Sequence, residues 1–413
     1  MAKKVAPLPI AHFTPDRQIP MKILFVHEVS WFSKVVYEMH DFPELLSLNG
    51  HEVHFLEFEE DQSRAHFKSV TSTESRSHPG SKVSVISPPH LFSGIFRRLI
   101  ALVIHPYLFL KLARSLKPDV VVTYSIPTSG WQIVAICNLL DVPVIVRAID
   151  VSHKLRKSRF EHAIKVAEQF VYKHAGHVCA NNESLRQYCV NMGAKLDESS
   201  VIYPGIDLKR FSPLVARQDL KQALGIKSTD KVLLFMGTLF RFSGLTELIS
   251  ELAPSLLNDK SLKFLILGEG EEFDRLQQVS DELKLDSQIL MPGRIEYDDL
   301  ADYLRLGDVA LLPFSPGIVT HNALPGKVLQ YLACGLPTIA TPLDGLMSMI
   351  PQGQGVIYAN NFSDMANAAI SLVEDADQRK LLSERGLVSL TQHCDWNSQI
   401  TKFENLLERV SIV

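Results

Sequence analysis

The chain has 413 residues, of which 46% are hydrophobic and 21% are charged, and its net charge is -4. This length is sufficient for two domains with separate cores, and the slightly acidic balance argues against nucleic acid as the main partner. The five cysteines are scattered and lack C-x-x-C spacing, so they indicate neither a disulfide framework nor a zinc site and favour a reducing cytoplasm.

Residues 1–20 are rich in proline and contain no apolar run of signal-peptide length, so we expect a flexible extension and no secretion. No stretch of the chain reaches the roughly 20 apolar residues that a membrane-spanning helix needs.

Short β-branched runs alternate with helical patterns along the chain, which is typical of parallel sheets with crossover helices. In the first half the expected strands begin at Lys22, Glu52, Val83, Asp119, Pro143 and His177. In the second half they begin at Val232, Lys263, Gln288, Val309 and Pro337. The fold class is therefore α/β, with two facing Rossmann-like doubly wound domains and a cleft between them.

Pro204, Gly205 and Pro213 mark the linker between the domains, because they break helices and favour an extended path. We expect the first domain at 21–204, the second at 205–394, and a helix at 395–413 that returns to the first domain. The polar segment Asp61 to Lys82 is expected to be a mobile loop.

Residues 322–341, NALPGKVLQYLACGLPTIAT, predict a helix whose start faces a ligand. The backbone N–H groups of Gly326 and Lys327 and the ammonium of Lys327 would attract a phosphate or diphosphate. The alternative is an ordinary crossover helix. Glycines also follow four strands of the second half, at Gly237, Gly268, Gly293 and Gly317. They would let a ligand approach the backbone, although tight turns use glycine as well.

A family resemblance rests on several motifs of the second half: VIYPGIDLKRF, FMGTLFRFSGLTELI, LKFLILGEGEEFDRL, LMPGRIEYDDLADYLRLGDVALLP and NALPGKVLQYLACGLPTIAT. Together they resemble the retaining family 4 glycosyltransferases of the GT-B fold, over about residues 21–396 and more closely in the second half. The resemblance implies a hexosyl transfer from a UDP- or GDP-linked sugar to a hydroxyl, in surface polysaccharide or glycolipid synthesis.

By this resemblance the second domain binds the donor. Gly293, Arg294 and Ile295 would lie along the nucleobase, Gly237 and residues 324–327 along the diphosphate, and Gln330 near the ribose. The full donor set is Gly237, Thr238, Arg241, Gly268, Gly293, Arg294, Ile295, Gly317, Ala323, Leu324, Pro325, Gly326 and Gln330.

The sequence departs from the family pattern at charged positions. The family has two glutamates eight residues apart where this chain has Asn322 and Gln330, and amides cannot place a negative charge beside an oxocarbenium ion. The usual arginine and lysine of the first glycine-rich loop align with Thr238 and Ser243. Arg241 or Lys327 would have to replace them.

The implied reaction retains the anomeric configuration and requires neutralisation of the leaving diphosphate more than a protein nucleophile. Asp150, Lys327 and Asn322 are the catalytic candidates, and His27, Glu28, Arg147 and His153 are the candidates on the acceptor side. The alternative for His153 is a solvated basic helix face. No cofactor is implied, and no D-x-D motif indicates a metal.

Residues 91–116 combine large apolar side chains with Arg97, Arg98, Lys111 and Arg114, as in helices that lie in an anionic membrane interface. In that case the acceptor would be a lipid-linked sugar at the inner leaflet. The alternative is a core helix hairpin broken at Pro106.

Two other functions remain open at this point. A nucleotide-sugar epimerase would need several carboxylates around the sugar, which the two amides disfavour. A non-catalytic nucleotide-sugar-binding subunit is compatible with the same two amides.

Overall fold

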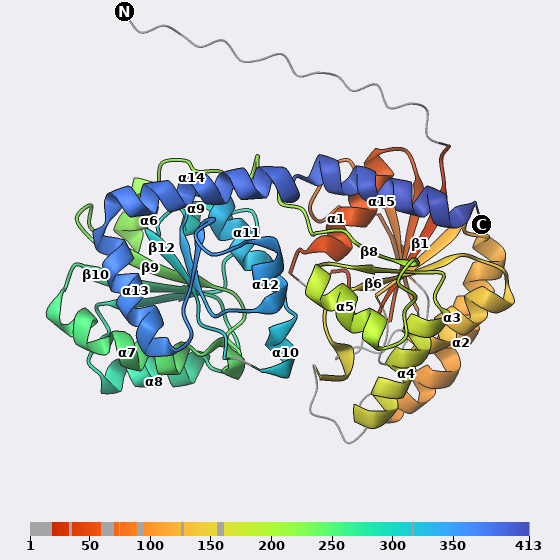
Figure 1. Ribbon diagram of the computed structural model, residues 1–413, viewed down its shortest axis with the longest axis horizontal. Coiled ribbons are helices and arrows are strands. Elements are labelled where there is room, and N and C mark those ends of the chain that lie inside the picture. The colour runs from red at the N-terminus through yellow and green to blue at the C-terminus, as the bar shows by residue number, and fades with distance from the viewer. Residues whose placement is uncertain are drawn as a thin grey trace, which may run out of the picture.

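The computed structural model describes residues 19–32, 35–58, 70–73, 75–88, 95–124, 128–154, 161–315 and 317–412. These residues form two sheets with helices packed around each of them (Figure 1). The predicted fold class, with two facing Rossmann-like domains, is confirmed. Of the predicted extension, residues 1–18 lie outside the described residues.

The first domain is built around β1, which lies in the middle of its sheet. Its elements are β1 (Lys22–His27), α1 (Glu38–Leu48), β2 (Glu52–Glu57), β3 (Val70–Ser72), β4 (Val83–Ser87), α2 (Ile95–Leu116), β5 (Val120–Thr123), α3 (Gly130–Leu139), β6 (Val144–Ala148), η1 (Ser152–Lys154), α4 (Glu161–His174), β7 (His177–Ala180), α5 (Glu183–Asn191) and β8 (Ser199–Val201). The strand order is β3-β4-β2-β1-β5-β6-β7-β8. Only the pairing of β3 with β4 is antiparallel within the described strands.

The second domain repeats the pattern with a shorter strand order, β11-β10-β9-β12-β13-β14, and parallel neighbours. Its elements are α6 (Gln218–Ala223), β9 (Lys231–Met236), η2 (Arg241–Ser243), α7 (Leu245–Asn258), β10 (Leu262–Leu267), α8 (Phe273–Glu282), β11 (Ile289–Gly293), α9 (Leu300–Leu304), β12 (Val309–Leu312), α10 (Ile318–His321), α11 (Gly326–Ala333), β13 (Thr338–Ala340), α12 (Asp344–Met349), β14 (Val356–Tyr358), α13 (Phe362–Glu374), α14 (Ala376–His393) and α15 (Trp396–Ser411). All the predicted strands are present in both domains.

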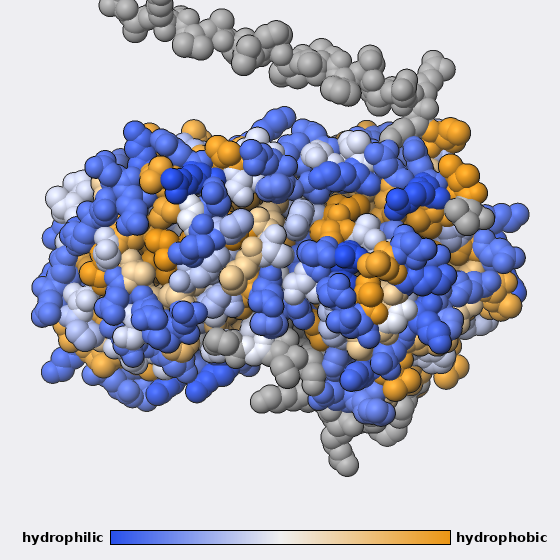
Figure 2. Space-filling view, viewed as in Figure 1, coloured by the Kyte–Doolittle hydropathy of each residue, from blue (hydrophilic) through white to orange (hydrophobic). Residues whose placement is uncertain are grey.

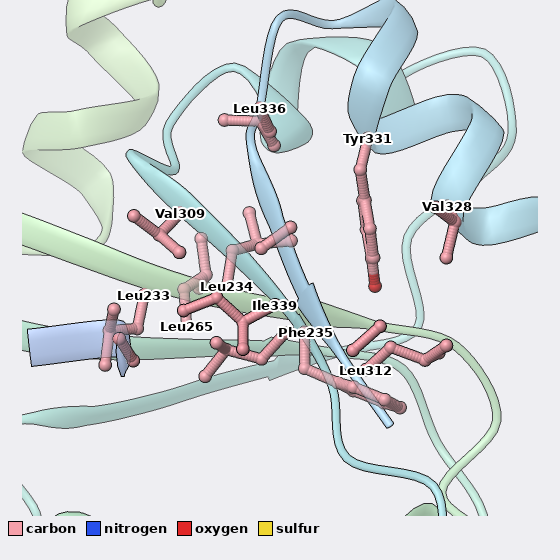
Figure 3. Packing of buried hydrophobic residues seen from close by; sticks show 14 of the residues in the cluster. Leu233, Leu234, Phe235, Leu265, Val309, Leu312, Val328, Tyr331, Leu336 and Ile339 are labelled. Carbon is pink, nitrogen blue, oxygen red and sulfur yellow. The ribbon is translucent and has the colours of Figure 1, made fainter. Parts of the chain in front are cut away.

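The core of the second domain fixes α11 against the end of β9. Strands buried on both faces need apolar residues throughout, and β9, β10 and β12 supply them (Figure 3). Tyr331 of α11 is fully buried, and its hydroxyl accepts from the N–H of Met236 at 2.7 Å and donates to the carbonyl of Met236 at 3.1 Å. The start of α11 is therefore tied to the carboxyl end of β9.

The chain crosses between the domains twice, and the two crossings lie side by side. The N–H of Ile206 donates to the carbonyl of Cys394 at 2.8 Å, and a Cβ on Gly205 would lie 2.2 Å from the ring of Trp396. Beyond this point α15 runs over the first domain (Figure 1), where Phe403 packs 4.6 Å from Phe42 between ring centroids. The last helix thus completes the core of the first domain.

Helix α2 is continuous through Pro106, so the alternative of a helix hairpin broken at that residue is wrong. A proline lacks the N–H that would bond the carbonyl four residues earlier, which here belongs to Leu102. The side-chain amide of Gln132 on α3 donates to that carbonyl at 2.7 Å. The orphaned acceptor is satisfied by a neighbouring helix, and α2 does not have to end.

Part of the predicted mobile loop is anchored on α1. Residues 59–69 and 74 lie outside the described residues, but Val70–Ser72 form β3 and the N–H groups of residues 76–78 donate to a carboxylate of α1. Glu44 accepts from the N–H groups of Ser77 at 3.0 Å and His78 at 2.6 Å, and Asp41 accepts from the Ser77 hydroxyl at 2.6 Å. The expectation rested on polarity alone and missed these buried acceptors.

Within the described residues, no helix is long and apolar enough to cross a membrane. Hydrophilic residues cover most of the face shown in Figure 2, with apolar residues in separate patches between them.

Candidate functional site

A cavity of about 870 Å³ lies between the domains. Its second-domain wall follows the carboxyl ends of β9, β10 and β11 and the start of α11, while its first-domain wall follows the start of α1. The predicted donor residues that line it are Gly237, Thr238, Gly268, Arg294, Ile295, Ala323, Leu324, Pro325, Gly326 and Gln330, together with Lys327. The sequence therefore located the second-domain wall.

Lys327 occupies the centre of that wall. Its ammonium lies 4.5 Å from the centroid of the Phe235 ring and 4.9 Å from that of Phe314. A Cβ at Gly237, whose φ is +140°, would lie 2.2 Å from the Lys327 Nζ. Glycine at this position leaves the space that the ammonium fills, and most side chains would expel it.

The Lys327 ammonium has no carboxylate partner among the described residues. The residue as a whole is half-buried, whereas its head group lies against aromatic rings. Burial lowers the pKa of Lys327 to about 7. Burial disfavours the charged form of Lys327, and an anion that enters the site would compensate this charge.

The first turn of α11 adds backbone donors to the same place. Pro325 is the N-cap, so the helix begins at Gly326, which is exposed. The first N–H groups of a helix have no partner within it and carry partial positive charge. Together with Lys327 they form a site suited to a phosphate or diphosphate.

Two of the strand-end glycines are explained by packing of the backbone. A Cβ on Gly268 would lie 2.0 Å from the carbonyl oxygen of Gly237, and one on Gly270 would lie 2.5 Å from that of Leu239. The loops after β9 and β10 therefore press together directly. From the sequence, glycine is expected here to let a ligand approach the backbone. The packing of the two loops is sufficient to explain Gly268.

Four predicted site residues of the second domain do not line the cavity: Arg241, Gly293, Gly317 and Asn322. The exposed guanidinium of Arg241 lies 3.7 Å from Glu272 and 4.0 Å from Glu247. The side chain is thus exposed beside these carboxylates and outside the cavity wall. Arg241 therefore does not replace the missing loop cations in this structure, and Lys327 alone of the two candidates lies in place.

The predicted acceptor-side residues also lie outside the cavity wall, in buried contacts of the first domain. Glu28 accepts from the N–H of Ser129 at 2.8 Å and the N–H of Thr128 at 3.0 Å, at the start of α3. His27 stacks on Tyr124 with ring centroids 5.0 Å apart, and its Nε2 lies 3.0 Å from the Tyr37 hydroxyl. His27 thus contacts Tyr37, which lines the cavity.

Arg147 is fully buried and forms a two-pronged ion pair with Glu38. Its Nε lies 2.7 Å from Oε1 and its Nη2 lies 2.8 Å from Oε2 of that residue. A third nitrogen, Nη1, donates to the carbonyl of Ala180 at 3.1 Å. The pair joins β6 and β7 to the start of α1, so Arg147 is not open to an acceptor.

His153 and Asp150 lie beyond the end of β6, among buried groups. His153 Nδ1 lies 2.7 Å from Glu168 Oε2, which excludes the expected solvated helix face. The remaining residues of that face, 155–160, lie outside the described residues. Burial and the neighbouring Glu168 and Glu38 carboxylates raise the pKa of Asp150 to about 7. Asp150 is therefore a carboxyl group that can exchange protons near neutral pH.

Sequence reasoning missed the first-domain wall and the aromatic part of the second. The cavity is also lined by Tyr37, Glu38, Asp41, Arg76, Phe240, Phe242, Glu269, Tyr297 and Trp396. A signal for the first three existed, because the helix after the opening strand of a Rossmann-like domain begins at the same sheet edge as the ligand site. Among the described side chains, no cluster of His, Cys, Asp and Glu is placed to hold a metal ion.

Comparisons with known families agree with this architecture. The model "Glycosyl transferases group 1" matches residues 216–387, and "Glycosyltransferase Family 4" matches residues 40–210. The chain belongs to the family 4 glycosyltransferases. The resemblance inferred from the motifs of the second half is thus confirmed, and the first-domain match extends it.

Solved structures of similar fold cover nearly the whole chain. HepE from Anabaena, in complex with UDP, superposes with a TM-score of 0.73 at 16% identity, covering 94% of this chain and 100% of that one. Sucrose-phosphate synthase from Thermosynechococcus elongatus superposes with a TM-score of 0.75 at 16% identity, covering 94% and 99%. At such identities the likeness shows the GT-B fold.

The curated relatives are similar over part of their length. D-inositol 3-phosphate glycosyltransferase of Geodermatophilus obscurus is 29% identical over 53% of this chain and 49% of its own. The UDP-Gal:alpha-D-GlcNAc-diphosphoundecaprenol alpha-1,3-galactosyltransferase of Escherichia coli is 25% identical over 64% and 69%. The chain spans about half to two thirds of the length of the first curated relatives it matches.

The buried pair of Arg147 and Glu38 yields a stability prediction for this glycosyltransferase family member. Arg147→Met should lower the free energy of unfolding by about 3 to 5 kcal/mol, because it leaves the Glu38 carboxylate buried without its partner. Adding Glu38→Gln to this variant should recover part of the loss. Urea denaturation of both variants measures it, and a loss below about 1 kcal/mol in the single variant would contradict a structural role for the pair.

Proposed function

We propose that the protein is a retaining glycosyltransferase that moves a sugar from a nucleoside diphosphate sugar, UDP- or GDP-linked, to an acceptor hydroxyl. The observation that carries the proposal is the unpaired Lys327 ammonium beside the start of α11 in the interdomain cavity. A helix start and a buried cation without a carboxylate partner favour a bound diphosphate.

The donor would lie along the second-domain wall. Its base would contact the segment from Gly293 to Ile295, its diphosphate would contact Gly237 and Lys327, and its ribose would contact Gln330. The lining of the cavity by most of these residues supports this placement. HepE, of the same fold, is described in complexes with UDP and with UDP-glucose, which supports UDP as the leaving group.

In the proposed reaction the bond between the anomeric carbon and the diphosphate oxygen breaks, and the acceptor oxygen bonds to that carbon on the same face. Lys327 and the α11 N–H groups neutralise the charge that develops on the departing diphosphate. Asp150, with its pKa near 7, is our candidate to receive the acceptor proton, directly or through Tyr37. No step of this scheme requires a divalent metal.

The acceptor would be a sugar or a lipid-linked sugar, as in surface polysaccharide or glycolipid synthesis. The Escherichia coli relative, whose name includes a diphosphoundecaprenol-linked sugar, supports a lipid-linked acceptor. Helix α2 supports contact with a membrane, because Val103 and Tyr107 are exposed next to the exposed Lys111 and Arg114. Arg97 and Arg98 belong to the first two turns of the same helix.

One alternative has a specific observation in its favour. The amide at Gln330 and the placement of Asn322 outside the cavity leave the donor site without the two family glutamates, as in a subunit that binds nucleotide sugars without turnover. Incubation with UDP- and GDP-sugars and assay of free nucleoside diphosphate separates the functions. Release that increases with a sugar acceptor supports transfer. Binding of the nucleotide sugar without release of nucleoside diphosphate under any condition would support the non-catalytic subunit. A change in the sugar without free nucleoside diphosphate would support an epimerase.

Lys327 should make nucleotide binding depend on pH. Its pKa in the free protein is about 7, so raising the pH above 7 removes the charge that a diphosphate needs. UDP affinity of the wild type should therefore fall between pH 7 and pH 9, by up to about tenfold per unit. In Lys327→Arg the guanidinium stays charged and the affinity should vary much less.

Isothermal titration across this pH range measures both proteins. Lys263→Arg, on a surface lysine of β10 outside the cavity, is the matched control and should behave as the wild type. Parallel pH curves for wild type and Lys327→Arg would remove Lys327 from the anion site.

Gln330 should contribute to ribose binding through its amide. Gln330→Leu should weaken nucleotide binding by about two- to tenfold, the usual value of one hydrogen bond, and Gln330→Glu should preserve or tighten it. Equal affinities of the leucine variant and the wild type, measured by titration, would show that the ribose is held elsewhere.

Helix α2 should bind anionic membranes. Each basic residue near an anionic surface contributes about 1 kcal/mol, so Arg97→Glu/Arg98→Glu and Lys111→Glu/Arg114→Glu should each reduce co-sedimentation with anionic liposomes. Binding of the wild type should weaken at high salt. The control pair Lys263→Glu/Arg275→Glu lies in the second domain. Wild-type protein that stays in the supernatant with anionic vesicles would contradict membrane contact.

A further inference from the structure

Asn322, at the position of the first family glutamate, is bonded to the opposite domain. Its side-chain Oδ1 accepts from the hydroxyl of Ser184 at 2.5 Å, and its backbone carbonyl accepts from the side-chain amide of Asn182 at 2.9 Å. Both partners lie at the start of α5 in the first domain, which faces α12 and α10 of the second in Figure 1. The segment before the anion site is therefore attached to the acceptor-side domain.

The first-domain half of this contact is rigid. Asn182 is fully buried and is the N-cap of α5, where its Oδ1 accepts from the N–H of Leu185 at 2.9 Å. Its amide nitrogen also donates to Asn181 Oδ1 at 2.8 Å. Because its oxygen and nitrogen both have partners on their own helix start, the amide can present only its remaining N–H to Asn322.

The second-domain half is equally confined. A Cβ on Gly345, in the first turn of α12, would lie 2.4 Å from the carbonyl oxygen of Asn322 and 2.5 Å from that of Ala323. The backbone at 322–323 is thus pressed on α12 from one side and bonded to α5 from the other. Only Ala323 to Pro325 separate this contact from the first turn of α11.

We propose that Asn322 is a positioning residue that latches the two domains together and sets the anion site at α11 relative to the acceptor side. The expected effect of this latch on catalysis rests on the proposed function, whereas the contact between the two domains does not. The positioning role differs from the role that the family resemblance implies, in which the residue at this position contacts the donor sugar. The absence of Asn322 from the cavity wall favours the latch.

The geometry gives the proposal a sharp test, because Ser184→Ala and Asn322→Ala remove the same hydrogen bond from opposite sides. Each should lower kcat by about five- to tenfold with a UDP affinity within about twofold of wild type, since the proposed nucleotide contacts lie in the second domain. The double variant should be no slower than either single variant, as expected when two residues act only through each other. Ser348→Ala, whose exposed hydroxyl bonds only to Gly345 of its own helix, is the matched control.

Amide hydrogen exchange of the ligand-free protein tests the latch without any assay of transfer. Exchange at residues 320–324 should accelerate in Ser184→Ala and in Asn322→Ala and stay unchanged in Ser348→Ala. Unchanged exchange in the first two variants would overturn the latch. A second outcome would also overturn the latch. If Asn322→Ala lost much more kcat than Ser184→Ala, and the losses were additive in the double variant, Asn322 would be shown to contact the donor. A wild type that neither transfers sugar nor binds UDP or GDP would instead refute the proposed function, and the exchange data would still decide the latch.

Discussion

The site depends on one ammonium that lies among aromatic rings and has no carboxylate partner in the part of the chain that the structure describes. Lys327 lies against Phe235 and Phe314 in the space left by the glycine at 237, and burial lowers its pKa to about 7. Isolated buried cations are unfavourable, so such a group persists where an anion completes the site. Its position is fixed by the core, because the Tyr331 hydroxyl ties α11 to the end of β9 (Figure 3).

The fold could be predicted from the sequence to a large extent, because buried parallel strands need continuous apolar runs and such runs are visible without a structure. The strands that were missed, β3, β8 and β14 (Val356–Tyr358), have only three residues each and form no such run. β8 is the short polar run Ser199–Val201, and β3 lies within a polar segment held by the carboxylates of α1. The continuity of α2 through Pro106 depends on Gln132, a partner from another helix that no local pattern reveals.

The two sides of the candidate site also differ in how far the sequence could predict them. The second-domain wall of the cavity follows strand ends and a helix start, whose geometry is set by short-range rules, and the motifs there predicted its position. The acceptor side could not be located in this way, because polar residues near strand ends have several available partners. Glu28 bonds to the start of α3 and Arg147 to Glu38, and only the tertiary structure decides between such contacts and an open site.

The positions that differ from the family pattern can be understood from their contacts in the structure. Thr238 and Ser243 stand where the family has loop cations, and the Lys327 ammonium at the start of α11 has a pKa of about 7, so that an entering anion would set its charge. Gln330 lines the cavity as a neutral hydrogen-bonding group, whereas the amide oxygen of Asn322 accepts from Ser184 of the other domain. The two amides thus have different surroundings, because Gln330 faces the cavity whereas Asn322 joins the two domains.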